Sequence, residues 1–406
     1  MSSYVKIANS LQLRPWQRSK QARSKPFAID YWFFGAVICL LCIGVVMTGS
    51  ASISIAEREM QQPMYYLLRQ LIYVGVGVAA AYCVLQIPLV FWEKTGPYLL
   101  IGAISLLVIV LIPGIGLQVN GSTRWINLGV ANLQPSEFVK LFFVVYLAGY
   151  LVRRKKEIRE NIKGFIKPVA LLTITSLLLF AEPDFGTVVV LSATVFGMLF
   201  LAGVRLLHFS VFVFIVLSAL VAMALSAPYR MERLTTFLNH WDDPFNSGFQ
   251  LTQALIAFGR GEWFGVGLGG SVQKLFYLPE AHTDFVFAVI AEELGLFGSF
   301  VVIGLFSIVI WRTFAIASIA EQAGKRFAAY LAYGVGLWFS LQVIINLGVN
   351  MGVLPTKGLT LPLMSYGGSS MVSICIALAL VMRVYHETSN RAQGTRRKVK
   401  GKVNRL

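Results

Sequence analysis

Long apolar runs alternate with short polar segments along most of this chain. Ten mostly apolar windows are each roughly 17–25 residues long, which is the length that a helix needs to cross a hydrocarbon core of about 30 Å. The windows fall at 30–51, 65–87, 97–114, 135–152, 166–181, 187–204, 206–227, 285–311, 327–351 and 369–385. The pattern predicts an all-α, polytopic membrane protein with ten transmembrane helices and a large loop, residues 228–284, between the seventh and the eighth.

Composition and charge support this prediction and add an orientation. Hydrophobic residues make up 56% of the chain and charged residues only 13%, which is too apolar for a soluble domain. Residues 1–28 hold six Lys or Arg, residues 153–167 seven and residues 388–406 seven, of 35 in total. Because cytoplasmic loops keep the positive charge, both termini are predicted to be cytoplasmic, with loop 228–284 on the opposite side. The predicted divisions are a basic tail at 1–29, a membrane domain at 30–387 and a basic tail at 388–406.

The formal net charge of +16 does not indicate nucleic-acid binding. The cytoplasmic tails and loop account for most of it, and no nucleic-acid recognition motif accompanies the basic residues. We expect these residues to contact anionic membrane lipids instead.

Three polar segments on the predicted non-cytoplasmic side are rich in Gly, Pro and small residues, which favours ordered turns. They are residues 119–137, 228–284 and 353–370. Within the second, Leu251, Leu255 and Phe258 follow an i, i+4, i+7 pattern, which predicts a short amphipathic helix at the membrane surface, a platform for a lipid-linked substrate. The stretch "GRGEWFGVGLGGS" that follows lacks the strand and helix of a nucleotide-binding loop and is interpreted as a close-packed turn.

Asp284 lies where the long loop ends and the eighth predicted helix begins. Either Thr283 or Asp284 is the N-cap of a helix that starts at Phe285, or Asp284 is a general base at the membrane surface. Glu292 and Glu293 follow about two turns later, roughly 12 Å away, which exceeds the separation of about 5–9.5 Å expected for paired glycosidase carboxylates. A lone surface base, with deeper acids that brace the bundle, therefore fits better than a two-acid hydrolase.

Charged residues inside the apolar spans are costly and need partners. Glu137 and Lys140 are three apart on one predicted helix and are expected to pair. Arg69 is expected to neutralise Glu292 or Glu293. The structural interpretation of these groups is that they hold the bundle together, and the functional one is a relay or a deep polar path.

Basic residues are few on the predicted non-cytoplasmic face. They are Arg124, Arg230, Arg233, Arg260, Lys274 and Lys357. Each alone is typical of an interfacial anchor, whereas together they would hold the oxygens of a pyrophosphate and stabilise a departing charge. His282 is either structural or a proton relay, and it has no neighbouring ligand cluster that would indicate a metal centre.

Several of these stretches resemble a known family. They are "STRWINLG" with "LQPSEFVK", "AEPDFGT", "DPFNSGFQLTQALIAFGRGEWFGVGLGGSVQK", "YLPEAHTDFVFAVIAEELG" and "LPTKGLTLPLMSYGGSS". In this order, over about residues 30–387, they resemble the family of shape, elongation, division and sporulation membrane proteins. The stretches "EAHTDF" and "DPFNSGFQL" favour its cell-division branch over its rod-elongation branch.

The resemblance implies a ten-span glycosyltransferase of the bacterial inner membrane. Such an enzyme polymerises a lipid-linked disaccharide-pentapeptide, lipid II, into peptidoglycan strands at the periplasmic face of the division septum. The implied partners are a class B penicillin-binding transpeptidase and other division proteins. The family's essential Asp matches Asp284, and its other motif positions match Arg124, Glu137, Lys140, Glu292, Lys357 and Ser369.

The residues around Asp284 and the family resemblance both lead us to expect a direct displacement. Asp284 acts as general base on a hydroxyl of the acceptor, the nascent glycan strand, and the lipid pyrophosphate departs with inversion. Substrate binding is assigned to Arg124, Lys357, Arg260, Lys274 and Ser369. An Arg, a Lys or a divalent cation such as Mg²⁺ or Mn²⁺ would stabilise the leaving charge, and the sequence itself requires no cofactor.

Two other classes of function stay open. One is a flippase for the same lipid-linked precursor, with Glu137, Lys140 and Glu292 along a deep polar path. The other is a non-catalytic division scaffold, which needs only the bundle and its partners. An enzyme should depend most on Asp284, and a transporter on the mid-membrane charges.

Overall fold

The computed structural model describes residues 27–403 except 120, 130, 131, 206, 208, 212, 215–217, 219–247, 356 and 357. Its helices are α2 (Tyr31–Met60), α3 (Tyr65–Gln86), α4 (Leu89–Val110), α5 (Pro135–Arg153), α6 (Lys155–Glu160), α7 (Ile162–Ala181), α8 (Phe185–Leu201), α11 (Phe249–Gly261), α12 (Val286–Gln322), α13 (Arg326–Asn350) and α14 (Gly368–Val403), with a π-helical turn η2 (Gln273–Tyr277). Three short strands, β1 (Gly116–Val119), β2 (Ser122–Asn127) and β3 (Asn132–Leu133), form an antiparallel sheet in the order β1-β2-β3.

The described helices confirm a polytopic helical membrane protein. Eight of them are long and apolar enough to cross a membrane, namely α2, α3, α4, α5, α7, α12, α13 and the first part of α14. A further apolar helix, α8, has 17 residues. The span predicted at 206–227 lies mostly outside the described residues, so the total of ten stays a prediction.

Four predicted boundaries fall inside longer helices, among them the ends of α12, at Gln322 and not 311, and of α14, at Val403 and not 385. The third span begins at Leu89 and not at residue 97, because Glu93 and Lys94 interrupt the apolar run without interrupting the helix. The first helix continues to Met60, past the predicted end at residue 51, since its last turns are polar but still helical. Apolar windows mark where lipid contacts a helix, and the helix itself continues beyond them.

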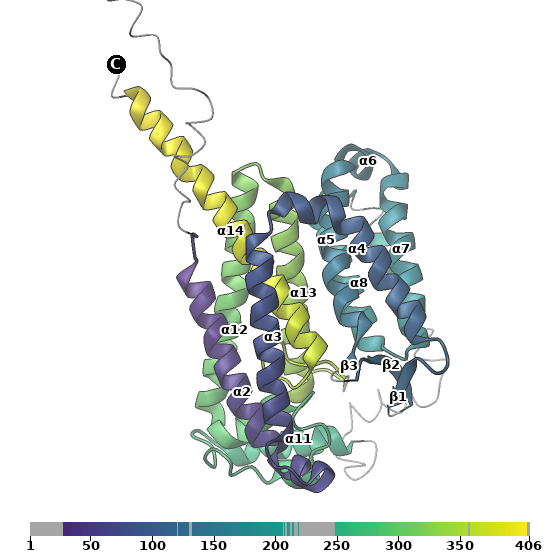
Figure 1. Cartoon of the computed structure of the whole chain (residues 1–406), viewed down its shortest axis with the longest axis vertical. Helices are drawn as coiled ribbons and strands as arrows, with labels where there is room; N and C mark the ends of the chain where they lie inside the picture. Colours follow the sequence, from purple (N-terminus) through teal and green to yellow (C-terminus); the bar gives the residue numbers. More distant parts are fainter. Residues whose placement is uncertain are drawn as a thin grey trace, which may run out of the picture.

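The helices form two groups that meet along α13 (Figure 1). One group holds α2, α3, α12, α13 and α14, and the other holds α4 to α8. Within the first, α14 packs along α3, and α12 packs against both α2 and α13, while α13 also contacts α5 and α8 of the second group. Large side chains such as Phe143, Phe306 and Trp338 are fully buried along these contacts.

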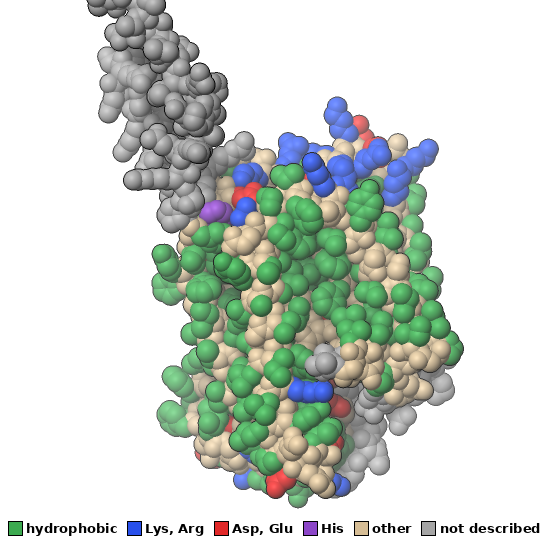
Figure 2. All heavy atoms as spheres, viewed as in Figure 1, with side chains coloured by type: hydrophobic (Ala, Val, Ile, Leu, Met, Phe, Trp, Pro, Cys, Tyr) green, Lys and Arg blue, Asp and Glu red, His purple; other side chains and the backbone are tan. Residues whose placement is uncertain are grey.

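The outer surface carries many exposed apolar side chains (Figure 2). Leu68, Ile101, Leu177 and Phe300 are each more than half exposed. A soluble monomer rarely exposes apolar patches of this extent, so this surface is the one that faces lipid.

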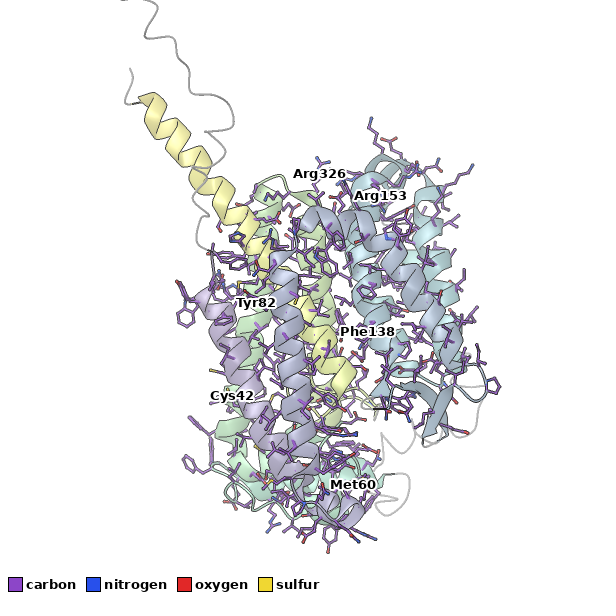
Figure 3. All side chains as sticks on the ribbon, viewed as in Figure 1. Cys42, Met60, Tyr82, Phe138, Arg153 and Arg326 are labelled. Carbon is purple, nitrogen blue, oxygen red and sulfur yellow. The ribbon has the colours of Figure 1, made fainter. Side chains whose placement is uncertain are left out.

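The two ends of the bundle differ in charge. Lys and Arg gather at the end where α6 lies, which is also the end of Arg153 and Arg326 (Figures 2 and 3). Met60 lies at the opposite end, together with the small sheet and α11 (Figures 1 and 3). We call this second end the loop end.

The predicted amphipathic helix is present at the loop end. It is α11, and its buried side, which includes Leu251, Ala254 and Ala257, packs mainly against α12. The helix therefore fixes the loop to the bundle beside the start of α12.

Candidate active site

A cavity of about 390 Å³ opens at the loop end, between elements of both helix groups. Its chemically active lining consists of the acids Glu137, Asp184, Glu280 and Asp284, the cations Arg69 and Arg124, the aromatic residues Tyr73, Trp125 and Tyr366, and Ser369 and Ser370. The structure thus brings together four of the predicted catalytic, substrate-binding or relay residues, namely Asp284, Arg124, Glu137 and Ser369. Lys357, Arg230 and Arg233 lie outside the described residues.

Asp284 does not cap the helix that follows it. Helix α12 begins at Val286, its N-cap position is Phe285, and no side chain of its own turn makes the cap hydrogen bond. The N-cap interpretation of Asp284 is therefore wrong. Its half-buried carboxylate lies in the cavity, where Oδ2 is 3.2 Å from the position that a Cβ on Gly358 would take. A glycine at 358 leaves room for the acid.

The surroundings of Asp284 suit a base. Burial raises the pKa of Asp284 to about 7, with Glu280 and Asp184 acting in the same direction and Arg124 opposing them. A carboxylate with a pKa near neutrality combines a large charged fraction with good basicity.

Arg124 is held by the turn between α7 and α8. Its Nε donates to the carbonyl of Glu182 at 3.1 Å, and Nη2 donates to the carbonyl of Pro183. Asp184 caps α8, with Oδ1 accepting from Thr187 N at 3.2 Å and Oδ2 accepting from its hydroxyl at 2.7 Å. These two carbonyls are neutral, so the bonds hold Arg124 in place without neutralising its positive charge, which is available to a ligand in the cavity.

Glu182 is a buried acid that sequence reasoning missed. The side chain is fully buried, and neither carboxylate oxygen has a hydrogen-bond partner in the described part of the chain. Burial raises the pKa of Glu182 to about 8, Asp184 raises it further, and Arg124 lowers it. The stretch "AEPDFGT" contains both acids, but its sequence does not show that Glu182 turns inward.

Replacing Glu182 by Gln is expected to change how stability depends on pH. The folded state holds the proton more tightly than the unfolded chain, whose pKa is about 4.5, so the free energy of unfolding of the wild type falls as pH rises from about 4.5 to about 8. Glu182→Gln removes the part of this fall that comes from Glu182, whereas Asp284, whose pKa is also raised, still contributes. At pH 8 the variant should therefore be more stable than the wild type by a few kcal/mol and unfold at a higher temperature. Thermal unfolding in detergent at pH 5 and pH 8 measures it. Equal pH dependence in both proteins would contradict the expectation, and the exposed Glu160→Gln is the control.

Glu137 and Lys140 pair as predicted. Lys140 Nζ lies 2.8 Å from Glu137 Oε1, and both side chains are buried. Ser373 Oγ donates to the other Glu137 oxygen at 3.3 Å, and Lys140 donates to Gln342 Oε1 at 3.2 Å. The pair links α5 to α13 and α14 beneath the cavity.

Ser369 links the start of α14 to the small sheet. Its hydroxyl accepts from Gln134 N at 2.9 Å and donates to the carbonyl of Asn132 at 3.3 Å. These bonds place the Gly-rich start of α14 against the cavity wall.

The prediction that Arg69 neutralises Glu292 or Glu293 was wrong. Glu292 pairs with Arg260 at 3.0 Å and Glu293 with Lys274 Nζ at 2.9 Å. Arg69 instead lies over the Tyr65 ring and lines the cavity. The true partners come from a loop that folds back onto α12, which spacing along the chain does not show.

Because they pair with Glu292 and Glu293, Arg260 and Lys274 do not lie beside Asp284. Neither lines the cavity. Lys274 Nζ also donates to Ser50 Oγ and to the carbonyl of Gly269, at 3.1 and 2.7 Å. The substrate-binding role expected for these two cations has no geometric support, and Arg69 takes their place beside Arg124.

The Gly-rich stretch is a close-packed turn, as predicted, and it fills a break in α12. Gly295 has φ +67° and interrupts the helix. The carbonyls of Glu292 and Glu293 accept from the amides of Val266 and Gly267 at 3.0 and 3.1 Å. A Cβ on Gly265 would lie 2.2 Å from the Glu293 carbonyl oxygen, so only glycine allows this approach.

His282 packs against aromatic rings. Its ring centroid lies 4.8 Å from that of Tyr66 and 5.6 Å from that of Tyr366, and burial lowers the pKa of the imidazole. His282 does not line the cavity. These contacts support the structural interpretation.

The described residues contain no group of three or more His, Cys, Asp or Glu side chains that could hold a metal ion. Asp184, the N-cap residue of α8, lines the cavity and accepts from Thr187 with both oxygens. A divalent cation that stabilises the leaving charge stays a prediction.

Comparison with known proteins matches almost the whole membrane domain. The family described as "Cell cycle protein", which takes in FtsW, RodA and SpoVE, matches residues 31–390. A probable peptidoglycan glycosyltransferase FtsW of Nitrosococcus halophilus is 59% identical over 359 residues, which are 88% of this chain and 92% of the relative. Its namesake in Legionella pneumophila is 52% identical over 96% of this chain and 99% of its own length.

Solved structures share the fold. One, titled as the structural coordination of polymerization and crosslinking by a peptidoglycan synthase complex, has a TM-score of 0.73 and 29% identity over 89% of this chain and 98% of its own. The rod shape determining protein RodA of Thermus thermophilus has a TM-score of 0.65 and 27% identity over 88% and 97%. With the family match and the cavity in agreement, this chain belongs to the FtsW, RodA and SpoVE family of cell cycle proteins.

Proposed function

We propose that this chain is a peptidoglycan glycosyltransferase that polymerises lipid II into glycan strands during cell division. The observation that carries the proposal is the Asp284 carboxylate, which is not used as a helix cap and faces a cavity with two arginines at one end of a membrane bundle. Relatives with identities of 59% and 52% bear the name of this activity and of the division member.

The lining of the cavity fits a glycosyl displacement. Asp284 takes the proton of an acceptor hydroxyl as its oxygen attacks the anomeric carbon of the donor sugar, and the bond from that carbon to the lipid pyrophosphate breaks. One displacement inverts the anomeric centre. Arg69 and Arg124 face the same cavity and would neutralise the departing pyrophosphate.

The remaining lining would hold the sugars. Tyr73, Trp125 and Tyr366 offer apolar ring faces, and Ser370 and Thr360, whose hydroxyls lie 3.0 Å apart, offer polar contacts. The cavity volume of about 390 Å³ lies in the range of about 300–1,000 Å³ for small-molecule sites. It suits the reacting sugars, with the lipid chain and the growing strand outside it.

The charge distribution sets the orientation that we propose. Lys and Arg gather at the end with α6 (Figure 2), so this end would face the cytoplasm together with both termini, and the loop end would face the periplasm. The protein would lie in the inner membrane at the division septum. A peptidoglycan synthase complex is the subject of a similar solved structure, and we propose that this chain works with a class B penicillin-binding transpeptidase and other division proteins.

A flippase is less well supported. The deep charges that such a path would use are engaged with protein groups, Glu137 with Lys140 and Glu292 with Arg260. They would have to leave these partners to contact a lipid headgroup. Asp284, in contrast, has its carboxylate in the cavity at the loop end.

Polymerisation of purified lipid II by the detergent-solubilised full chain with its cognate transpeptidase tests the proposal. We expect glycan strands, resolved by length on a gel. If no strands form and the protein reconstituted in vesicles moves lipid II across the bilayer, the flippase is correct. If neither activity is found, the protein is a scaffold.

A further inference from the structure

The start of α12, two residues after Asp284, takes its cap from another helix. The first amides of a helix need acceptors, which a side chain at the N-cap normally supplies. Phe285, at that position, has no such side chain. Instead Asn350 Oδ1, at the end of α13, accepts from Ala288 N at 3.1 Å, an amide that it shares with the Phe285 carbonyl at 3.0 Å. Ala288 is the third residue of α12, which is where an N-cap oxygen usually bonds.

The same asparagine and its neighbour one turn earlier hold the backbone of Asp284. Asn346 Nδ2 donates to the Asp284 carbonyl at 2.9 Å, and Asn350 Nδ2 donates to the same oxygen at 3.0 Å. Both asparagines are buried, with at most 2% of each exposed. Two donors occupy both lone pairs of this carbonyl, so its peptide plane is fixed relative to α13.

Asn346 also fixes the wall that faces Asp284. Its amide donates to the carbonyl of Leu359, and the adjacent Gly358 is the residue that lies against Asp284 Oδ2. The Asn346 side chain thus links the segment of Asp284 to the segment of Gly358 and Leu359 that lies against it.

We propose that Asn350 and Asn346 are positioning residues for glycosyl transfer, because the cap that Asn350 places on α12 and the bonds of both amides to the Asp284 carbonyl leave the Asp284 carboxylate free to face the cavity. The inference rests on the proposed function for its readout. Asp is itself among the best N-cap residues. An uncapped α12 would therefore recruit Asp284, turning its carboxylate from the cavity toward the helix amides.

The recruited carboxylate would have a different pKa. Hydrogen bonds from amides and the helix N-terminus both favour its charged form and lower the pKa. The other charged groups that line the cavity are Arg69 of α3, Arg124 of β2, Glu137 of α5, Asp184 at the start of α8 and Glu280 of the preceding turn. They stay in place when Asn350 changes, so a shift in pH dependence reports on Asp284.

The experiment compares polymerisation by the full chain with its transpeptidase across pH for wild type, Asn350→Leu and Asn350→Asp. Asn350→Leu removes the cap, and we expect kcat to fall on the order of 10²-fold, as for a small misplacement of a reacting group. KM should change little. The pH at which kcat falls on the acidic side of the pH profile should become lower. Asn350→Asp keeps the acceptor for Ala288 N but loses the donor to the Asp284 carbonyl, so it should recover at least about tenfold of the loss without reaching the wild-type kcat, and the acidic limb of its pH profile should not move to lower pH.

Thr313→Val is the matched control, because it also removes a buried hydrogen bond of α12, from Thr313 Oγ1 to the Val309 carbonyl at 2.7 Å, far along the helix from Asp284. It should keep the wild-type kcat and pH profile. If Asn350→Leu does not fold, Asn350→Ser, whose short side chain does not reach Ala288, takes its place with the same expected shift.

The outcomes separate the two proposals. If the wild type makes no strands, the proposed function fails. If the wild type is active and the uncapped variant keeps its kcat, or loses kcat together with melting temperature but keeps the pH profile, the positioning role is overturned.

Discussion

Replacing Lys140 by Met is expected to lower the free energy of unfolding by about 3–5 kcal/mol, because it leaves a buried carboxylate without its cation. Lys140 is only 1% exposed and pairs with Glu137 at 2.8 Å. Methionine keeps most of the apolar stem, so the loss reports on charge more than on packing. Unfolding of the purified protein in detergent, by heat or by SDS titration, measures the change.

A second substitution shows that the effect comes from the pair. Glu137→Gln removes the stranded charge and keeps an oxygen for Ser373, which donates to Glu137 at 3.3 Å in the native protein. The double variant Glu137→Gln with Lys140→Met should therefore be more stable than Lys140→Met alone. Losses that simply add would mean that the two side chains do not stabilise each other.

Replacing Asp284 by Asn or Ala is expected to reduce kcat of glycan polymerisation by about 10²–10⁴-fold, the usual contribution of a general base. Folding should survive, because the carboxylate makes no cap bond to α12 and the backbone carbonyl remains held by Asn346 and Asn350. Initial rates with lipid II measure the loss, and melting temperatures close to wild type confirm the fold.

Asn at this position separates catalysis from structure. Asparagine caps helices as well as aspartate does, so a structural role would be preserved in Asp284→Asn and lost only in Asp284→Ala. Equal loss of activity in both variants assigns the residue to chemistry. Wild-type rates with Asp284→Asn would remove Asp284 from the mechanism.

Local patterns made much of the fold predictable. The apolar windows located the membrane helices because the length and apolarity of a segment decide by themselves whether it can cross the hydrocarbon core. The pair Glu137 and Lys140 followed from i, i+3 spacing on one helix, and the structure confirms it. The Gly-rich turn also followed from composition alone.

Contacts between distant segments were not predictable in the same way. Arg260 and Lys274 reach Glu292 and Glu293 only because the loop folds back onto a broken helix. Glu182 turns inward at the end of α7, and no spacing rule shows its burial. The small sheet also stayed unseen, since its strands have six residues or fewer.

The two asparagines that hold the Asp284 backbone form a pattern in the sequence whose meaning becomes clear only with the structure. Asn346 and Asn350 are two buried amides at i, i+4 spacing in the mostly apolar α13, one turn beyond a third, Gln342. Polar side chains inside a membrane span need partners. The sequence does not reveal that the partner is the backbone of the candidate base, 62 and 66 residues earlier in the chain.

The most direct test of Asp284 as general base is the pH dependence of kcat/KM for lipid II polymerisation. The ratio reports ionisations of the free enzyme, and burial raises the pKa of Asp284 to about 7. Because only the charged carboxylate accepts a proton, kcat/KM should rise through one ionisation at about pH 7 and level off above it, with the same midpoint in Glu182→Gln. A ratio that is flat or falls between about pH 5 and 8 would contradict the assignment.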